Sequence, residues 1–402
     1  MKTVRVAVYS IALNEASFVK RWCESAAGAD LILLGDTGST DNTVALAREA
    51  GAEVAPLRVS PWRFDDARNA LLAAIPLDID YCIALDLDEV LLPGWKLELQ
   101  KALELGLTRP RYLYTWSWAD ADRTVPGLQY LGDKIHSRSS YRWIHPVHET
   151  LTSYGSSPVR EGEIDLRINH YPDSSKSRSQ YLPLLEMAVQ ERPTDARCLF
   201  YLGREYSFYG QTDLAILRLS ECLYDLPPMW APERAAARRL LAKLVPSRAE
   251  ALLRQAVADA PDRREPLMDL AQLYYDRQNW NSCRYFAEKA LTITKKSLDY
   301  LCEREAWSAL PHDLIAISAY HLNDFEAALL HGEQAAALEP SDLRLQRNIS
   351  FYRKGLASNA AADVAATLTI AASESPLASE GEGAGGVTRL VLRSGSLPGS
   401  TR

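Results

Sequence analysis

An apolar segment, Tyr81–Leu85, runs directly into three acidic residues, Asp86, Asp88 and Glu89. At the carboxyl end of a parallel β-strand, side chains face the crevice in which α/β proteins bind ligands. Asp86 and Asp88 are two residues apart, so we expect them to point to the same side. Two such carboxylates suit a hard divalent cation whose remaining ligands come from a diphosphate. A solvent-exposed acidic turn is the alternative for this segment taken alone.

Polar residues follow two earlier strand-like segments in the same way. Asn14 and Glu15 come after the first segment, and Asp36 ends the second, just before a helix start. A carboxylate there can accept the imide N–H of uracil or the hydroxyls of a ribose. Arg68 lies in a predicted helix and is a candidate for the same ligand, with an exposed helix charge as the alternative. We therefore expect ligand-binding groups along one edge of a sheet.

The elements that position these residues alternate between strand and helix over residues 1–172. Such alternation predicts a mostly parallel sheet with helices on its faces. The expected strands are Val4–Tyr9, Leu31–Leu34, Ala52–Leu57 and Tyr81–Leu85, and the expected helices are Glu15–Ala27, one starting at Ser39–Asp41, and Asp65–Ile75. Beyond Pro110 the pattern changes, and we expect antiparallel additions at one end of the sheet from Arg111–Ala119, Tyr141–Ile144 and Glu163–His170.

Four short motifs follow one another in this region, and their order and spacing are informative. They are Asn14-Glu15, Asp36-Thr37-Gly38-Ser39-Thr40-Asp41, Ala67-Arg68-Asn69-Ala70 and Asp86-Leu87-Asp88-Glu89. Together they resemble the family 2 glycosyltransferases of the Rossmann-like GT-A fold. The resemblance implies inverting transfer from a nucleotide sugar, most often a UDP-sugar, with Mn²⁺ or Mg²⁺ as cofactor. The donor-binding residues that it implies are Asn14, Glu15, Asp36, Arg68 and Asp86, with Asp88 at the metal-bound diphosphate.

A second cluster, Trp143–Thr150, contains His148 and Glu149. An inverting transferase needs a general base that deprotonates the acceptor. We expect Glu149 in this role, with His148 as the alternative. His170 ends a predicted strand and is a candidate metal ligand beside Asp88, because imidazole is an acceptable ligand for Mn²⁺. Ordinary hydrogen bonding is the alternative for each histidine.

Helical patterns dominate from about Ser174 to Leu356 and repeat. Small residues at Gly203, Ala237 and Ala271 are 34 residues apart, and a fourth copy starts from Ala316 after extra residues around Lys295–Trp307. This spacing resembles the tetratricopeptide repeat, which consists of two antiparallel helices. An irregular helical bundle is the alternative. We expect residues 173–357 to form repeats that bind the acceptor, a partner protein or a second copy of the chain.

Composition and charge exclude several classes. Hydrophobic residues make up 47% and charged residues 24% of the 402 residues, as in soluble globular proteins. The net charge of −7 is spread over both halves, so nucleic acid is not a favoured partner. We find no apolar run long enough for a membrane span and no secretory signal. Six scattered cysteines indicate reduced thiols and a cytoplasmic location. Residues 358–402 read as a disordered tail.

The resulting hypothesis is a metal-dependent glycosyltransferase with a GT-A domain, tetratricopeptide-like repeats and a tail. Known relatives of this architecture include bacterial and phage proteins, among them the sublancin-type peptide S-glycosyltransferases. The acceptor stays open between a peptide or protein, a glycan precursor and a modified base. The main alternative is a repeat scaffold whose GT-A domain binds nucleotide without turnover. A nucleotidyltransferase is a weaker alternative, because Ser10–Asn14 has no glycine.

Overall fold

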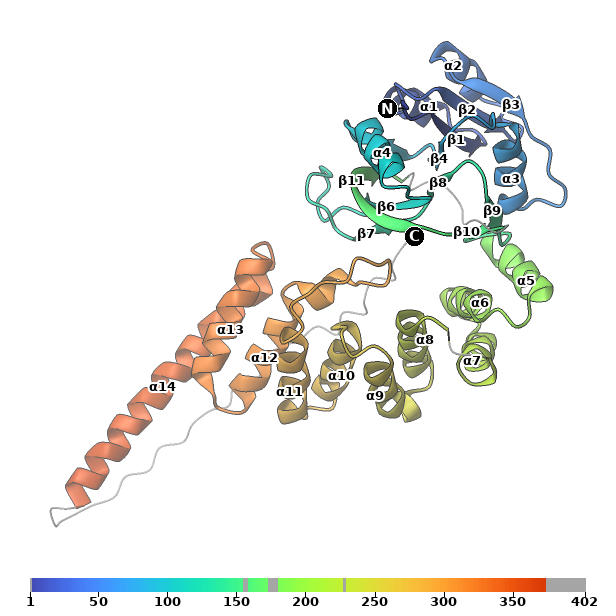
Figure 1. Cartoon of the computed structure of the whole chain (residues 1–402). Helices are drawn as coiled ribbons and strands as arrows, with labels where there is room; N and C mark the ends of the chain where they lie inside the picture. The colour runs from blue at the N-terminus through green and yellow to red at the C-terminus, as the bar shows by residue number, and fades with distance from the viewer. Residues whose placement is uncertain (1, 155–157, 173–179, 227–228, 374–402) are drawn as a thin grey trace.

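The computed structural model describes residues 2–154, 158–172, 180–226 and 229–373. Within these ranges, an N-terminal part contains the strands and a C-terminal part is built of helices (Figure 1). The expected order, an α/β region followed by a helical one, is confirmed. Among the described residues, no helix is both long and apolar enough to cross a membrane.

The main sheet has five strands in the order β3-β2-β1-β4-β8. The first four are parallel, and β8 runs antiparallel to β4. Their bounds are β1 Val6–Ala12, β2 Leu31–Asp36, β3 Glu53–Pro56, β4 Tyr81–Ala84 and β8 Ile135–Ser137. The connecting helices are α1 Ala16–Ser25, α2 Thr43–Glu49 and α3 Phe64–Ala74.

Both faces of this sheet are covered, which explains why β1 is mostly apolar, with Ser10 as a buried polar exception. Val6 and Val8 pack on one side with residues of α1 and of α4, which spans Trp95–Glu104. Ala7 and Tyr9 pack on the other side with α3. The alternation along β1 follows from the two-residue period of a strand.

A second, four-stranded sheet has the order β5-β11-β6-β7. Its strands are β5 Glu89–Leu91, β6 Arg109–Thr115, β7 Gln129–Gly132 and β11 Glu161–His170. A separate hairpin of β9 Tyr141–Ile144 and β10 Thr150–Ser153 packs against α3 and the main sheet. The expected antiparallel additions are therefore only partly correct. β11 pairs in parallel with β6, and only β8 extends the main sheet. This pairing joins strands far apart in the chain, which a local pattern does not encode.

The helical part begins with α5 Tyr181–Glu191 and continues as four antiparallel pairs. These are α6 Ala196–Phe208 with α7 Thr212–Ser220, α8 Ala231–Leu244 with α9 Ala249–Asp259, α10 Glu265–Asp276 with α11 Trp280–Leu291, and α12 Leu310–His321 with α13 Phe325–Leu338. The expected small residues lie where the helices touch. A Cβ atom on Gly203 would come within 2.8 Å of the Leu219 side chain, so only glycine fits there. The repeats are confirmed as successive helix pairs.

The extra residues before the fourth pair form a bridging loop, residues 292–303, followed by the short helix η3 Arg304–Trp307. The carbonyl of Leu298 accepts a hydrogen bond from the N–H of Leu131 in β7 at 3.0 Å. The loop is anchored in the repeats by ion pairs of Arg263 with Asp299 and of Arg239 with Glu303. The repeats therefore reach back to the α/β part at a second place, besides the direct chain connection (Figure 1).

The last helix, α14, spans Leu343–Ser373 and passes the boundary at residue 358 that composition suggested. The segment that crosses this boundary is rich in alanine, the residue with the highest helix propensity. Residues 374–402 of the expected tail lie outside the described residues.

Candidate active site

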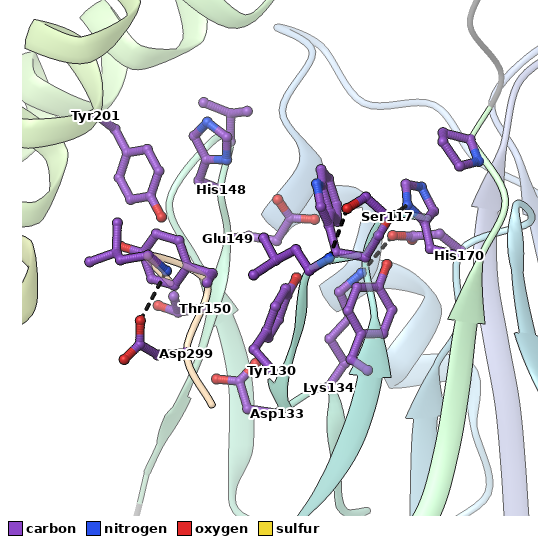
Figure 2. Close-up of a pocket in the computed structure, with 18 of the residues that line it drawn as sticks. Ser117, Tyr130, Asp133, Lys134, His148, Glu149, Thr150, His170, Tyr201 and Asp299 are labelled. Carbon is purple, nitrogen blue, oxygen red and sulfur yellow. Dashed lines mark hydrogen bonds and ion pairs between the residues drawn. The ribbon is translucent and has the colours of Figure 1, made fainter. Parts of the chain in front are cut away.

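A cleft of about 2400 Å³ separates the α/β part from the repeats. Eight of the nine candidate residues line it, and they come from segments spread over 157 positions of the chain. They are Asn14, Glu15, Arg68, Asp86, Asp88, His148, Glu149 and His170. The ninth, Asp36, is not part of the lining, although its neighbour Thr37 is. In the view of Figure 2, Glu149 lies between His148 on one side and Lys134 and His170 on the other.

The main sheet explains why the early candidates meet at one place. In the parallel register, Ala12 of β1 lies opposite Asp36 of β2, and Tyr9 lies opposite Ala84 of β4. The residues that follow these strands therefore leave the sheet at the same edge. This is the carboxyl-terminal edge, where ligands bind in open α/β sheets.

Asp36 and Asn14 hold two loops together at this edge. The Asp36 carboxylate accepts hydrogen bonds from the N–H groups of Gly38 at 3.2 Å and Ser39 at 3.2 Å. The Asn14 side-chain oxygen accepts from the N–H of Thr40 at 2.8 Å, and Asn14 itself adopts φ 58°. Both side chains thus shape the loop that follows β2.

Asp86 lies at the centre of a partly buried ion network. One carboxylate oxygen accepts from Arg68 Nη2 at 2.7 Å, and the other accepts from Lys134 Nζ at 2.6 Å. Lys134 also donates to Glu89 at 3.1 Å, and the other Glu89 oxygen accepts from the Asp86 N–H at 2.9 Å. Lys134 was missed in the sequence, because it is a single lysine in the turn between β7 and β8 with no motif around it.

The charges in this network set the protonation of its acids. Burial alone would raise the pKa of Asp86, but the positive charges of Arg68 and Lys134 hold that pKa well below its ordinary value. Burial raises the pKa of Glu89, Lys134 opposes this effect, and the charge of Asp86 adds to it. Glu89 also accepts a hydrogen bond from the Tyr114 hydroxyl at 2.7 Å. Asp86 is therefore fixed as a carboxylate at the edge of the cleft.

The side chains of Asp88 and His170 lie next to each other in the wall of the cleft. His170 Nε2 lies 3.3 Å from an Asp88 oxygen, and His170 Nδ1 lies 2.9 Å from the carbonyl oxygen of Trp116. Because a carbonyl can only accept, Nδ1 carries the proton in the neutral ring. The Trp116 ring stacks on the imidazole at 4.7 Å and fixes its plane. Burial would lower the pKa of His170, but the hydrogen bond and charge of Asp88 raise it.

This pair fits a divalent cation. In the neutral ring, the lone pair of Nε2 points toward the Asp88 carboxylate. Two electron-pair donors are therefore directed at the same position, where a cation can bind both. A histidine held through its other nitrogen by a carbonyl is the usual arrangement of a metal-ligating imidazole. A nitrogen and carboxylate donor set is acceptable to Mn²⁺. Asp88 and His170 would hold the ion, with Asp86 beside it.

Glu149 is tied to the same network from the other side. One of its oxygens accepts a hydrogen bond from Arg68 Nε at 2.5 Å, and the Glu149 side chain is 12% exposed. Arg68 thus joins Glu149 to Asp86, and its Nη1 is buried without a hydrogen-bond partner in the described part of the chain. His148 points toward the repeats instead, with its ring stacked on Tyr201 of α6 at 4.3 Å (Figure 2).

No protein-family model matches the chain. Among solved structures, MamA is 14% identical over 40% of this chain and 82% of its own, with a TM-score of 0.33. A thermophilic TPR protein of Thermus thermophilus is 17% identical over 44% of this chain and 90% of its own, with a TM-score of 0.30. Glucosyl-3-phosphoglycerate synthase from Mycobacterium tuberculosis, solved with Mg²⁺ and UDP, is 25% identical over 28% of this chain and 44% of its own. Its TM-score is 0.24. All three TM-scores are low, so the function proposed below rests on the residues of the cleft.

Proposed function

We propose that the chain is an inverting, metal-dependent glycosyltransferase with a GT-A catalytic domain and a tetratricopeptide-like repeat domain. Its donor is a nucleotide sugar, and the resemblance carried by the four motifs at residues 14–89 implies a UDP-sugar. One observation carries the proposal. The Asp88–His170 pair, the ion-paired Asp86 and the Glu149 carboxylate line one cleft at the carboxyl edge of a parallel sheet.

Each side chain has a defined task in this proposal. Asp88 and His170 hold the cation, which neutralises the diphosphate when bound. Asp86, kept ionised by Arg68 and Lys134, accepts hydrogen bonds from the ribose hydroxyls. Asp36 and the loop that it shapes lie at the nucleobase end of the donor site.

Glu149 serves as the general base. The acceptor oxygen, nitrogen or sulfur forms a bond to the anomeric carbon while the bond from that carbon to the diphosphate oxygen breaks. The proton of the acceptor passes to Glu149, and the nucleoside diphosphate leaves. Attack from the face opposite the leaving group inverts the anomeric configuration. A positioned base of this kind contributes roughly 10²–10⁴-fold to the rate.

The acceptor enters from the repeat side of the cleft in this proposal. That wall carries aromatic and basic side chains from α6, α8 and the bridging loop, including Tyr201, Arg204, Lys243 and Tyr300. Stacked helix pairs typically bind extended ligands or partner chains. A peptide or protein, a glycan precursor and a modified base all remain acceptors of the proposed reaction.

A donor screen tests the proposal. Hydrolysis of UDP-, GDP- and dTDP-sugars is measured with and without Mn²⁺ for the full-length chain and for Asp88→Asn. Asp165→Asn is a matched control, because Asp165 is 75% exposed on β11 and forms an ion pair with the nearby Arg167, away from the cleft lining. We expect Mn²⁺-dependent hydrolysis of one donor, lost in Asp88→Asn and kept in Asp165→Asn. Nucleotide binding without turnover of any donor would favour the scaffold alternative instead.

A further inference from the structure

The loop that carries the candidate base, residues 145–149, has a strained backbone at two positions. His145 has φ 78° and His148 has φ 49°, both in the left-handed region that side-chain-bearing residues rarely adopt. Such conformations persist only where surrounding contacts impose them. The α/β part contributes the Glu149–Arg68 ion pair and a hydrogen bond from the Phe64 N–H to the Pro146 carbonyl at 2.9 Å. The contacts of His145 and His148 described next come from helix α6.

His145 packs against the start of α6. Its Nδ1 lies 3.3 Å from the Cys198 sulfur, and its Nε2 lies 3.7 Å from an Asp195 oxygen. These three residues are close enough to share a metal ion. However, Asp195 also caps α6 by accepting from two backbone N–H groups, and burial raises the pKa of the Cys198 thiol to about 12. Because the Asp195 carboxylate is already engaged in this cap, we interpret the cluster as a polar contact that holds His145.

The next residues continue this pattern. Val147 is only 4% exposed and belongs to the hydrophobic cluster formed by the repeats rather than to a cluster of its own domain. The ring of His148 stacks on Tyr201 with centroids 4.3 Å apart and planes at 25°. Glu149 follows directly, so the position of its carboxylate depends on where Val147 and His148 are seated.

Tyr201 is itself held rigidly by the repeats. The guanidinium of Arg204 lies 4.4 Å from its ring centre and that of Arg197 lies 4.7 Å away. Tyr300 of the bridging loop stacks near it with a centroid distance of 6.4 Å. The Tyr201 side chain is 6% exposed. These contacts give it little freedom, so it can transmit a fixed position to the loop of residues 145–149.

We propose that Tyr201 is a positioning residue for Glu149, so that the active site is shared between the α/β domain and the first repeat. This inference rests on the proposed glycosyl transfer. It makes the repeats part of the catalytic apparatus, beyond any role in binding the acceptor. Tyr201 acts through His148 and the backbone of the loop, without touching the reacting atoms.

The experiment compares three full-length variants with the unmodified protein. Tyr201→Leu removes the stacking ring, and Tyr201→Phe keeps it. Tyr274→Leu is the matched control, because Tyr274 is 7% exposed and stacks on Phe286 at 5.5 Å within the repeats, outside the cleft lining. Measured quantities are the kcat, KM and pH profile of Mn²⁺-dependent donor hydrolysis and the Kd of UDP with Mn²⁺. If Tyr201→Leu does not fold, Tyr201→Met takes its place, because methionine fills irregular space.

We expect Tyr201→Leu to lower kcat by about 10²-fold, the cost of a misplaced catalytic group, with the Kd of UDP unchanged. The pH profile of kcat should lose the limb that reports the base, and Tyr201→Phe and Tyr274→Leu should resemble the unmodified protein. Unchanged kcat in Tyr201→Leu would overturn this inference and leave the proposed function intact. An equal loss of UDP affinity would also overturn it, since the effect would then be on the whole domain. Absence of turnover in the unmodified protein with every donor would overturn the proposed function, and this inference with it.

Discussion

The Nε atom of Arg68 donates a hydrogen bond to Glu149 at 2.5 Å. The same guanidinium donates from Nη2 to Asp86 at 2.7 Å, and the Arg68 side chain is only 5% exposed. Arg68 thus connects the residue proposed as base to a residue proposed to bind the donor. Burial would lower its pKa, but the two carboxylates raise it well above its ordinary value. The sequence-based role of Arg68, a contact to the donor, therefore gains a second element: it separates the nearly buried Glu149 carboxylate from the partly exposed Asp86 carboxylate.

The first prediction concerns this separation. Arg68→Met should destabilise the protein by roughly 1.5–3 kcal/mol, because it removes the charged hydrogen bonds to Glu149, which is 12% exposed, and to the partly exposed Asp86. Urea denaturation at pH 7 measures the loss. Arg109→Met is the comparison: Arg109 pairs with Asp133, which is 42% exposed, and a partly exposed pair contributes about 1 kcal/mol or less. Equal stability losses in the two variants would contradict a special role for Arg68.

The second prediction separates metal binding from nucleotide binding. Asp88→Ala should abolish the Mn²⁺-dependent part of UDP-sugar binding, because it removes the carboxylate that faces His170. Asp36→Asn should weaken nucleotide affinity tenfold or more and leave the dependence on Mn²⁺ intact, since one charged hydrogen bond is worth about 1.5–3 kcal/mol. Calorimetry with UDP, with and without Mn²⁺, measures both effects. Unchanged UDP affinity in Asp88→Ala under both conditions would contradict the assignment.

The strand-end candidates were predictable because their signals are local. An apolar run followed by acids marks the end of a buried strand, and parallel pairing then brings the ends of β1, β2 and β4 to one edge. The repeats were predictable for a similar reason, since small residues recur where the helices must approach closely. At Gly203 the neighbouring helix leaves no room for a Cβ atom.

The features that escaped prediction depend on contacts between distant segments. Lys134 reaches Asp86 from a turn 48 residues further along the chain, and no pattern in the sequence connects the two. The parallel pairing of β11 with β6 and the contact of Leu298 with Leu131 are equally non-local. The extra residues at Lys295–Trp307 were visible as an insertion, but their return to the α/β domain was not.

The third prediction concerns the identity of the base. Glu149→Gln should keep the affinity for UDP and Mn²⁺ and lower the rate of transfer or donor hydrolysis by roughly 10²–10⁴-fold. His148→Ala should have a smaller effect, because its ring lies on Tyr201 and acts on Glu149 through the backbone. Steady-state hydrolysis of the donor identified in the screen measures both. Normal rates in Glu149→Gln with an inactive His148→Ala would exchange the two roles, and normal rates in both would place the base elsewhere.

The fourth prediction concerns the pH dependence of stability. His136 is a buried residue of strand β8, and its Nε2 lies 3.2 Å from the Tyr9 hydroxyl while its Nδ1 lies 2.8 Å from the carbonyl oxygen of Ser137. The Tyr9 oxygen accepts from Trp143 Nε1 at 2.7 Å, so its own proton points to His136 Nε2. A second proton on His136, at Nε2, would point at the hydroxyl proton of Tyr9 and repel it. Burial accordingly lowers the pKa of His136 to about 4.

The sign of the effect follows from proton linkage. An unfolded histidine has a pKa near 6.5, so between about pH 6.5 and pH 4 the unfolded state binds a proton that folded His136 does not. Stability from this site is complete above pH 6.5 and decreases as the pH falls, by about 2 kcal/mol between pH 6.5 and pH 5. His136→Gln keeps polar atoms but does not titrate, so its stability at pH 7 should be lower and its decrease toward pH 5 smaller by that amount. Urea denaturation of both proteins at several pH values checks this. Parallel pH profiles for the two proteins would show that His136 is protonated as readily in the folded state as in the unfolded one.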